Sequence, residues 1–176
     1  MQLNLVPHPA TPPSEPFKVW ATIEHASSLG STASTNIWFG IGAPAARFLI
    51  PEPGEPRRAD ELWKTTCFEA FLRIPGSDAY REWNFAPSGQ WAAYDFAGYR
   101  EGMAEADVTP PYVRMEDNLI WWALGVTIAV DADSVWALGL SAVLEEKDGT
   151  KSFWALAHPT EKPDFHHEGS FVASLD

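Results

Sequence analysis

Cysteine is nearly absent from this sequence, and long hydrophobic runs and common enzyme motifs are missing. Cys67 is the one cysteine among 176 residues, which excludes an internal disulfide and a cysteine-based zinc site. The longest nearly apolar run, residues 119–130, is well short of the roughly 18 residues that a membrane-spanning helix needs. No glycine-rich phosphate loop, G-x-S-x-G motif or H-E-x-x-H motif is present. We therefore expect a non-enzymatic protein with no membrane-spanning helix.

Positive charge is also scarce. The chain has 12 Lys and Arg against 24 Asp and Glu, a formal net charge of −12. Such a protein repels phosphate backbones and anionic membrane surfaces, so we expect neither nucleic acid nor membrane as a partner. The first residues lack the basic region and apolar stretch typical of a signal peptide, which predicts a cytoplasmic protein.

Aromatic residues and prolines, by contrast, are abundant. The chain holds nine Trp, ten Phe and four Tyr, together with 15 Pro. Its length fits one domain over residues 1–176. Residues 7–16 are rich in proline, which predicts a stiff and poorly ordered segment.

Alternation of apolar and polar residues is common along the chain and helical periodicity is scarce, which favours strands. Turn signals divide the sequence into about nine or ten strands. We predict strands at residues 17–25, 35–41, 62–74, 80–85, 90–96, 119–128, 135–145 and 152–157, with a short piece at 47–50. The fold class is therefore all-β, an antiparallel β-sandwich of the jelly-roll or immunoglobulin-like kind.

The long segment 62–74 predicts one core face and one polar face. Its even positions, such as Phe68 and Leu72, are apolar apart from Lys64 and Thr66, whereas its odd positions include Trp63 and Glu69. Trp63 and Glu69 are six residues apart, so on a strand they share a face. An indole ring suits the C–H face of a sugar, and a carboxylate accepts hydrogen bonds from hydroxyl groups. This pair predicts a sugar-binding surface.

Glu82 and Asn84 share one side of the next predicted strand and would extend this surface. A structural alternative stays open at this stage. In that interpretation Trp63 covers the edge of the sandwich, and Glu69 pairs with Arg73 or Arg81.

Two predicted strands carry a face of small residues. Residues 119–128 present Ala123 and Gly125, and residues 135–145 present Gly139 and Ser141. Small side chains let another group approach a sheet closely. The group could be a ligand, a covering loop or a partner subunit, including a second copy in a homodimer.

The C-terminal part gathers His158, Asp164, His166 and His167 within ten residues. Histidine and aspartate are common metal ligands, so a metal site is one hypothesis. The alternative is that a histidine hydrogen-bonds backbone groups and fixes the loop.

Four segments carry a resemblance to a known family, namely residues 62–72, 80–94, 153–159 and 163–166. They resemble the DOMON-like superfamily, in particular an uncharacterised bacterial branch, and are more distantly similar to family 9 carbohydrate-binding modules. The resemblance covers most of residues 15–175. It implies a β-sandwich that binds either sugars or haem.

The resemblance also implies roles for particular residues. In family 9 modules two tryptophans sandwich a terminal sugar and a carboxylate holds its hydroxyl groups. Trp63 and Glu69 match the first tryptophan and the carboxylate, and Trp154 would supply the second ring. In the haem-binding relatives a methionine and a histidine or lysine ligate the iron, which makes Met103 and His158 the candidates here.

These observations predict a non-enzymatic module that binds a carbohydrate or sugar-like small molecule and needs no cofactor. One alternative is a haem- or metal-binding module for electron transfer. Another is an interaction subunit whose small-residue face docks a partner or its own copy.

Overall fold

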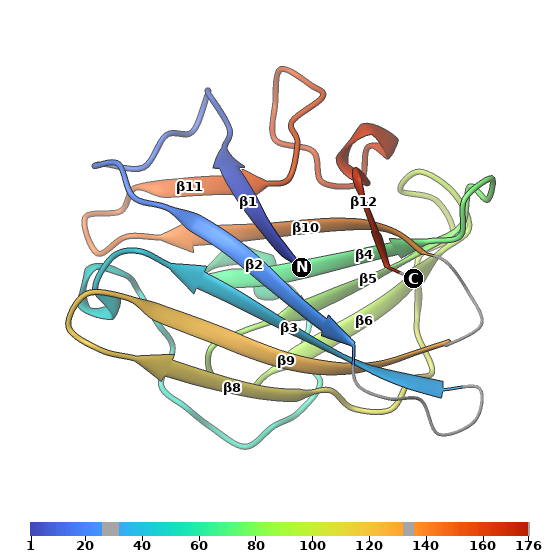
Figure 1. Cartoon of the computed structure of the whole chain (residues 1–176), viewed down its shortest axis with the longest axis horizontal. Coiled ribbons are helices and arrows are strands. Elements are labelled where there is room, and N and C mark those ends of the chain that lie inside the picture. Colours follow the sequence, from blue (N-terminus) through green and yellow to red (C-terminus); the bar gives the residue numbers. More distant parts are fainter. Residues whose placement is uncertain (26–31, 132–135, 176) are drawn as a thin grey trace.

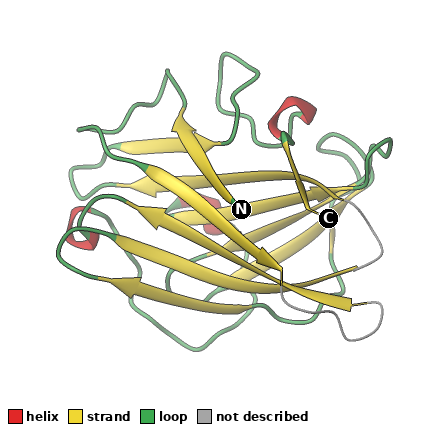
Figure 2. Cartoon of the chain, viewed as in Figure 1, coloured by secondary structure: helices red, strands yellow, loops and turns green. Residues whose placement is uncertain are grey.

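The computed structural model describes residues 1–25, 32–131 and 136–175, and these are built almost wholly from strands (Figures 1 and 2). The strands are β1 (Gln2–Pro7), β2 (Val19–His25), β3 (Thr32–Ile41), β4 (Cys67–Arg73), β5 (Tyr80–Phe85), β6 (Trp91–Phe96), β7 (Ala104–Glu105), β8 (Tyr112–Asp117), β9 (Trp122–Asp131), β10 (Trp136–Glu145), β11 (Lys151–Ala155) and β12 (Ala173–Leu175). Three short 3-10 helices cover Ala45–Arg47, Leu62–Lys64 and Glu168–Ser170. No helix in the described ranges is long and apolar enough to cross a membrane.

The strands follow one strongly curled, antiparallel path. Its order is β7-β6-β5-β4-β10-β11-β1-β2-β3-β9-β8, and β12 pairs with β10. Strand β1 joins the two halves, because residues 2–5 pair with β2 while Val6 and Pro7 pair with β11. The halves face each other across a shared core, in which the Phe39 and Phe68 rings lie 5.1 Å apart. The all-β, antiparallel sandwich class is confirmed, with twelve strands rather than about nine or ten.

Several predicted elements are confirmed. Strands β4, β5 and β6 form the expected meander, and β10 and β11 form a hairpin closed at residues 146–150. The apolar even positions of β4 and β9, including Phe68 and Leu124, lie in the core between the two halves. Period-two alternation therefore identified the inner faces of these strands.

Other element boundaries were predicted wrongly. The strand expected over 62–74 begins only at Cys67, because Leu62–Lys64 forms a 3-10 helix. The segment 47–50 forms a single bridge, from Phe48 to Glu146, instead of a strand. Strand β9 begins at Trp122, and Ile120, expected in the core, is 73% exposed in the preceding turn.

Strands β1, β7, β8 and β12 were not predicted. They are edge, short or half-exposed elements, and their burial patterns do not alternate clearly. Without a buried face, the sequence of such a strand carries little periodic signal.

The odd face of β4 is not a solvent face, contrary to expectation. Cys67 and Phe71 on this face are buried in a second hydrophobic cluster with Tyr80, Phe96 and Phe165. The C-terminal segment, residues 156–172, contributes Phe165 and Phe171 to this cluster and lies over the outer side of the sheet. Strand β4 is thus buried on both faces.

The small-residue faces are covered by the chain itself. A Cβ on Gly125 would lie 2.8 Å from the Trp38 ring of the neighbouring strand, and one on Gly139 would lie 3.3 Å from the Ser170 carbonyl oxygen. Glycine at these two positions therefore lets an indole ring and the C-terminal segment approach the sheet backbone.

The proline-rich segment is tied to the β10–β11 hairpin. The buried carboxylate of Glu146 accepts a hydrogen bond from the Ser14 backbone N–H at 2.9 Å. Its second oxygen lies 2.6 Å from Nε of Arg47. A single carboxylate therefore joins three parts of the chain.

Candidate functional site

A cavity of about 360 Å³ lies on the outer face of the β4–β5–β6–β10–β11 half, beneath the C-terminal segment. Its walls combine aromatic rings with a few charged groups. The lining residues are Trp63, Glu69, Glu82, Tyr94, Phe96, Arg100, Met103, Val143, Phe153, Pro163, Phe165 and His166. Apolar walls with few polar groups are typical of small-molecule sites.

Glu69 and Glu82 reach the cavity from neighbouring strands. Glu69 of β4 pairs with Asn84 of β5, so Glu82 lies diagonally beside it on the same face. The Ser141 hydroxyl donates to Oε2 of Glu69 at 2.9 Å, and Nδ2 of Asn84 donates to Oε1 of Glu82 at 2.6 Å. Both carboxyl groups are buried. Each is thus held in place by one neutral donor.

The environment favours the protonated form of these acids. Burial, and the nearby charge of Glu82, raise the pKa of Glu69 from 4.5 to about 8. Burial also raises the pKa of Glu82, although the Asn84 hydrogen bond and the Arg100 charge lower it in part. The carboxylate expected to be ionised beside Trp63 therefore carries a proton at neutral pH, because two negative charges cannot share a buried site cheaply.

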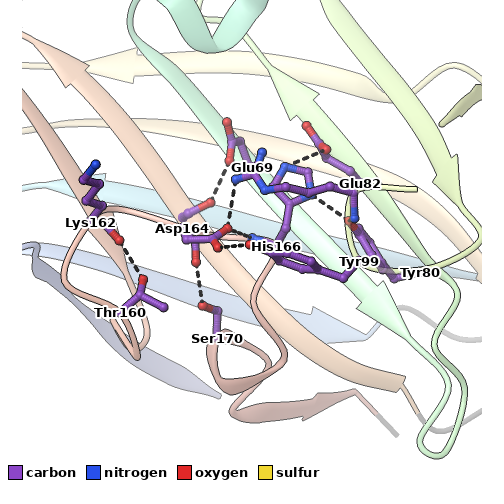
Figure 3. Close-up of polar contacts among 11 residues, drawn as sticks. Glu69, Tyr80, Glu82, Tyr99, Thr160, Lys162, Asp164, His166 and Ser170 are labelled. Carbon is purple, nitrogen blue, oxygen red and sulfur yellow. Dashed lines mark hydrogen bonds and ion pairs between the residues drawn. The ribbon is translucent and has the colours of Figure 1, made fainter. Parts of the chain in front are cut away.

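His166 faces Glu82 from the C-terminal segment (Figure 3). The Tyr80 hydroxyl accepts from the Arg100 backbone N–H at 3.2 Å and hydrogen-bonds Nδ1 of His166 at 2.7 Å. Nε2 of His166 lies 3.6 Å from Oε2 of Glu82. Burial and the Arg100 charge lower the pKa of His166 to about 4. The ring is therefore neutral at pH 7.

Arg100 forms its ion pair with Asp164 and not with Glu69 or Glu82. Its Nη2 lies 2.9 Å from Oδ1 of Asp164, and the Tyr99 hydroxyl donates to the other oxygen of that carboxylate. Arg100 has a positive φ of 56°, a conformation that side chains other than glycine adopt rarely. Asp164 is thus the ion-pair partner of Arg100, while the Arg100 charge still lowers the pKa of Glu69 and Glu82 in part.

Trp63 lies at the cavity mouth with 40% of its surface exposed. It reaches this position from the 3-10 helix Leu62–Lys64 rather than from a strand. The structure therefore brings Trp63, Glu69 and Glu82 together at one cavity. Trp63 comes from a 3-10 helix, however, and not from the strand that the alternation predicted.

Asn84 and Trp154 do not line the cavity. Asn84 is fully buried behind Glu82 and orients it. Trp154 is 2% exposed and belongs to the core between the halves, where its ring lies 4.9 Å from that of Phe17. The expectation that Trp154 supplies a second sugar-binding ring is wrong, because its position on β11 directs it to the opposite face of the sheet.

Only one of the two haem candidates lines the cavity. Met103 is among the lining residues, whereas His158 is not. Nε2 of His158 hydrogen-bonds the Val6 carbonyl oxygen at 2.9 Å, and its ring lies 4.8 Å from that of His8. The structure therefore does not bring Met103 and His158 together in the lining of this cavity.

The C-terminal histidines do not gather around a metal. Within the described parts of the chain, no group of three or more His, Cys, Asp or Glu side chains is placed to hold an ion. Nδ1 of His167 accepts from the Gly169 N–H at 3.0 Å and so fixes a loop. His158 and His167 therefore match the alternative interpretation, in which a histidine hydrogen-bonds backbone groups.

Sequence reasoning missed most of the cavity's aromatic wall. Tyr94 and Phe96 share one face of the predicted strand 90–96, which was an available signal. Phe165 and Arg100 lie on irregular segments, where no periodicity shows which way a side chain points. Their role depends on how the C-terminal segment folds back over the sheet.

Comparison with known proteins supports the fold. No family model matches the sequence, and no curated protein matches it significantly. A structure from Bacteroides uniformis ATCC 8492, described as a candidate carbohydrate-binding protein, is similar at a TM-score of 0.64 and 15% identity, over 97% of this chain and 83% of that chain. A family 9 carbohydrate-binding module from Caldicellulosiruptor kristjanssonii, in complex with glucose, is similar at a TM-score of 0.55 and 7% identity, over 98% of this chain and 82% of that chain. At such low identity these similarities establish a shared fold; membership of the DOMON-like superfamily stays a prediction.

Proposed function

We propose that the protein binds a carbohydrate in the cavity beside Trp63 and does not convert it chemically. The observation that carries this proposal is a half-exposed indole ring at the mouth of a cavity that contains two carboxyl groups. The ring can stack on the C–H face of a sugar, while Glu69 and Glu82 bond its hydroxyl groups.

The size and walls of the cavity support this proposal. A volume of about 360 Å³ lies within the range of small-ligand sites. Phe153 and Phe165 add apolar surface to the lining of the cavity, which Trp154 does not reach. The similar fold of a family 9 module solved with glucose makes a sugar the first ligand class to test.

A calorimetric titration with a panel of mono- and disaccharides tests the proposal, with tryptophan fluorescence as a second readout. We expect binding in the millimolar to micromolar range, weakened at least about tenfold by Trp63→Ala, since ring stacking supplies much of such an affinity.

Trp121→Ala is the matched control, because Trp121 lies in the turn before β9, far from the lining residues. This variant should bind as the unaltered protein does. Absence of binding by any sugar at millimolar concentration, or equal binding by Trp63→Ala, would contradict the proposal.

A further inference from the structure

Among the described residues, no Lys or Arg forms an ion pair with either carboxyl group of the cavity. Arg100 is the one Lys or Arg among the lining residues, and its guanidinium pairs with Asp164. His166 faces Glu82 but is neutral at pH 7 because burial lowers its pKa to about 4. The lining of the cavity therefore holds more acidic than basic groups, and both acidic side chains are buried.

Each carboxyl group also keeps one oxygen available. Glu69 is held through Oε2 by Ser141, and Glu82 is held through Oε1 by Asn84. Among the residues that the structure describes, the other oxygen of Glu69 accepts no hydrogen bond. Oε2 of Glu82 lies 3.6 Å from its nearest donor, His166, which is beyond a hydrogen bond. One oxygen of each carboxyl group is therefore left without a hydrogen bond to the described protein atoms.

The surrounding wall suits a positive charge. The rings of Trp63, Tyr94, Phe96, Phe153 and Phe165 all line the cavity. The face of an aromatic ring attracts a cation, and the attraction is largest where water is excluded. An ammonium group would be attracted both by the two acidic side chains and by the faces of the surrounding aromatic rings.

Resting on the function proposed above, we propose that the preferred sugar carries a protonated amine, as in a hexosamine, and that its ammonium group lies between Glu69 and Glu82. The ammonium donates one hydrogen bond to the available oxygen of each carboxylate. The sugar ring then extends toward Trp63 at the mouth of the cavity.

This placement links binding to proton release. Because the pKa of Glu69 is raised to about 8, the acid pair retains a proton at pH 6.5 before the ligand enters. An ammonium group favours the doubly ionised pair, so that proton leaves to solvent on binding. The titratable or charged groups that face the pair are Cys67, Tyr80, Tyr94, Arg100, Asp164 and His166.

Calorimetry of the full chain with D-glucosamine, D-glucose and N-acetyl-D-glucosamine at pH 6.5 tests the inference. We expect glucosamine to bind at least about tenfold more tightly than the other two sugars, since a charge-assisted hydrogen bond exceeds a neutral one. Repeating the titration in two buffers of different ionisation enthalpy should show net proton release for glucosamine only.

Glu82→Gln should reduce the preference for glucosamine to less than about threefold, and Glu69→Gln provides the same test if the first variant fails to fold. Glu116→Gln, on β8 in the other half of the molecule, is the matched control and should keep the full preference.

Equal binding of glucose and glucosamine by the unaltered protein would overturn this inference and leave the proposed function standing. No binding by any of the three sugars would overturn the proposed function itself. A glucosamine preference that survives both variants would place the amine elsewhere and so contradict the assignment of these two residues.

Discussion

At the scale of single residues, Glu69 shows how position changes the chemistry of a side chain. On the sequence it looks like an ordinary ionised carboxylate on a polar strand face. In the structure it is buried beside Glu82 and receives one neutral hydrogen bond, so burial raises its pKa to about 8. The residue type was predictable as part of the site, but its protonation state was not.

This raised pKa predicts a pH-dependent stability. An acid that is protonated in the folded state but ionised in the unfolded state stabilises the protein fully below its unfolded pKa, and this contribution is lost as pH rises toward its folded pKa. For Glu69 the window runs from about pH 4.5 to about pH 8. Below about pH 6.5 the lowered pKa values of His158 and His166 act in the opposite sense. The Glu69 effect is therefore clearest between pH 6.5 and pH 8.

We expect the free energy of unfolding, measured by urea denaturation, to fall with pH in that window by roughly 1 kcal/mol per pH unit. Glu69→Gln should flatten this slope, because glutamine does not titrate. Glu116→Gln, at an exposed edge strand, should retain it. An unchanged slope in Glu69→Gln would show that the carboxyl is ionised throughout the window.

At the scale of secondary structure elements, the strands that face the core were predictable and the irregular segments were not. Strands β5 and β6 match their predicted ranges nearly residue for residue, since each alternates and ends at a turn. The 3-10 helix at Leu62–Lys64 was missed although Lys64 and Thr66 interrupt the apolar even positions of the predicted strand 62–74. Those two polar residues were a local signal that the strand begins only at Cys67.

Glycine at a sheet surface gives a prediction at this scale. Gly125→Ala places a Cβ 2.8 Å from the Trp38 ring, and that ring in turn lies under the Arg114 guanidinium at 4.4 Å. Because both layers must shift, we expect a loss of about 1–3 kcal/mol in unfolding free energy.

Gly54→Ala is the matched control, since the nearest atom to its Cβ would be 4.0 Å away. Thermal denaturation of both variants measures the difference. Equal stability of the two would mean that Trp38 does not rest on the β9 backbone.

At the scale of the whole molecule, one half of the curled sheet is covered on both faces. Its inner face packs against the other half, and its outer face packs against the C-terminal segment. The cavity lies in the outer layer, and Phe165 and His166 of that segment form part of its lining. Stability and the proposed binding therefore depend on different layers.

Two aromatic truncations separate these layers. Phe39→Ala, in the core between the halves, should cost about 3–5 kcal/mol of unfolding free energy. Phe165→Ala should cost less, about 1–3 kcal/mol, because its ring already borders a cavity.

Sugar affinity should change in the reverse order: Phe165→Ala weakens it, and folded Phe39→Ala retains it. Chemical denaturation and calorimetry on the same samples measure both quantities. A larger stability loss in Phe165→Ala than in Phe39→Ala would contradict the assignment of the main core.

The sequence by itself determined the all-β class and the meander, because alternation and turn residues act over a few positions, and it singled out Trp63 and Glu69 as candidates. Only the tertiary structure decided which face of each sheet is covered, how Glu82, Arg100 and His166 meet, and that Trp154 belongs to the core. Those outcomes depend on how distant segments fold over one another. No local pattern in the chain encodes that arrangement.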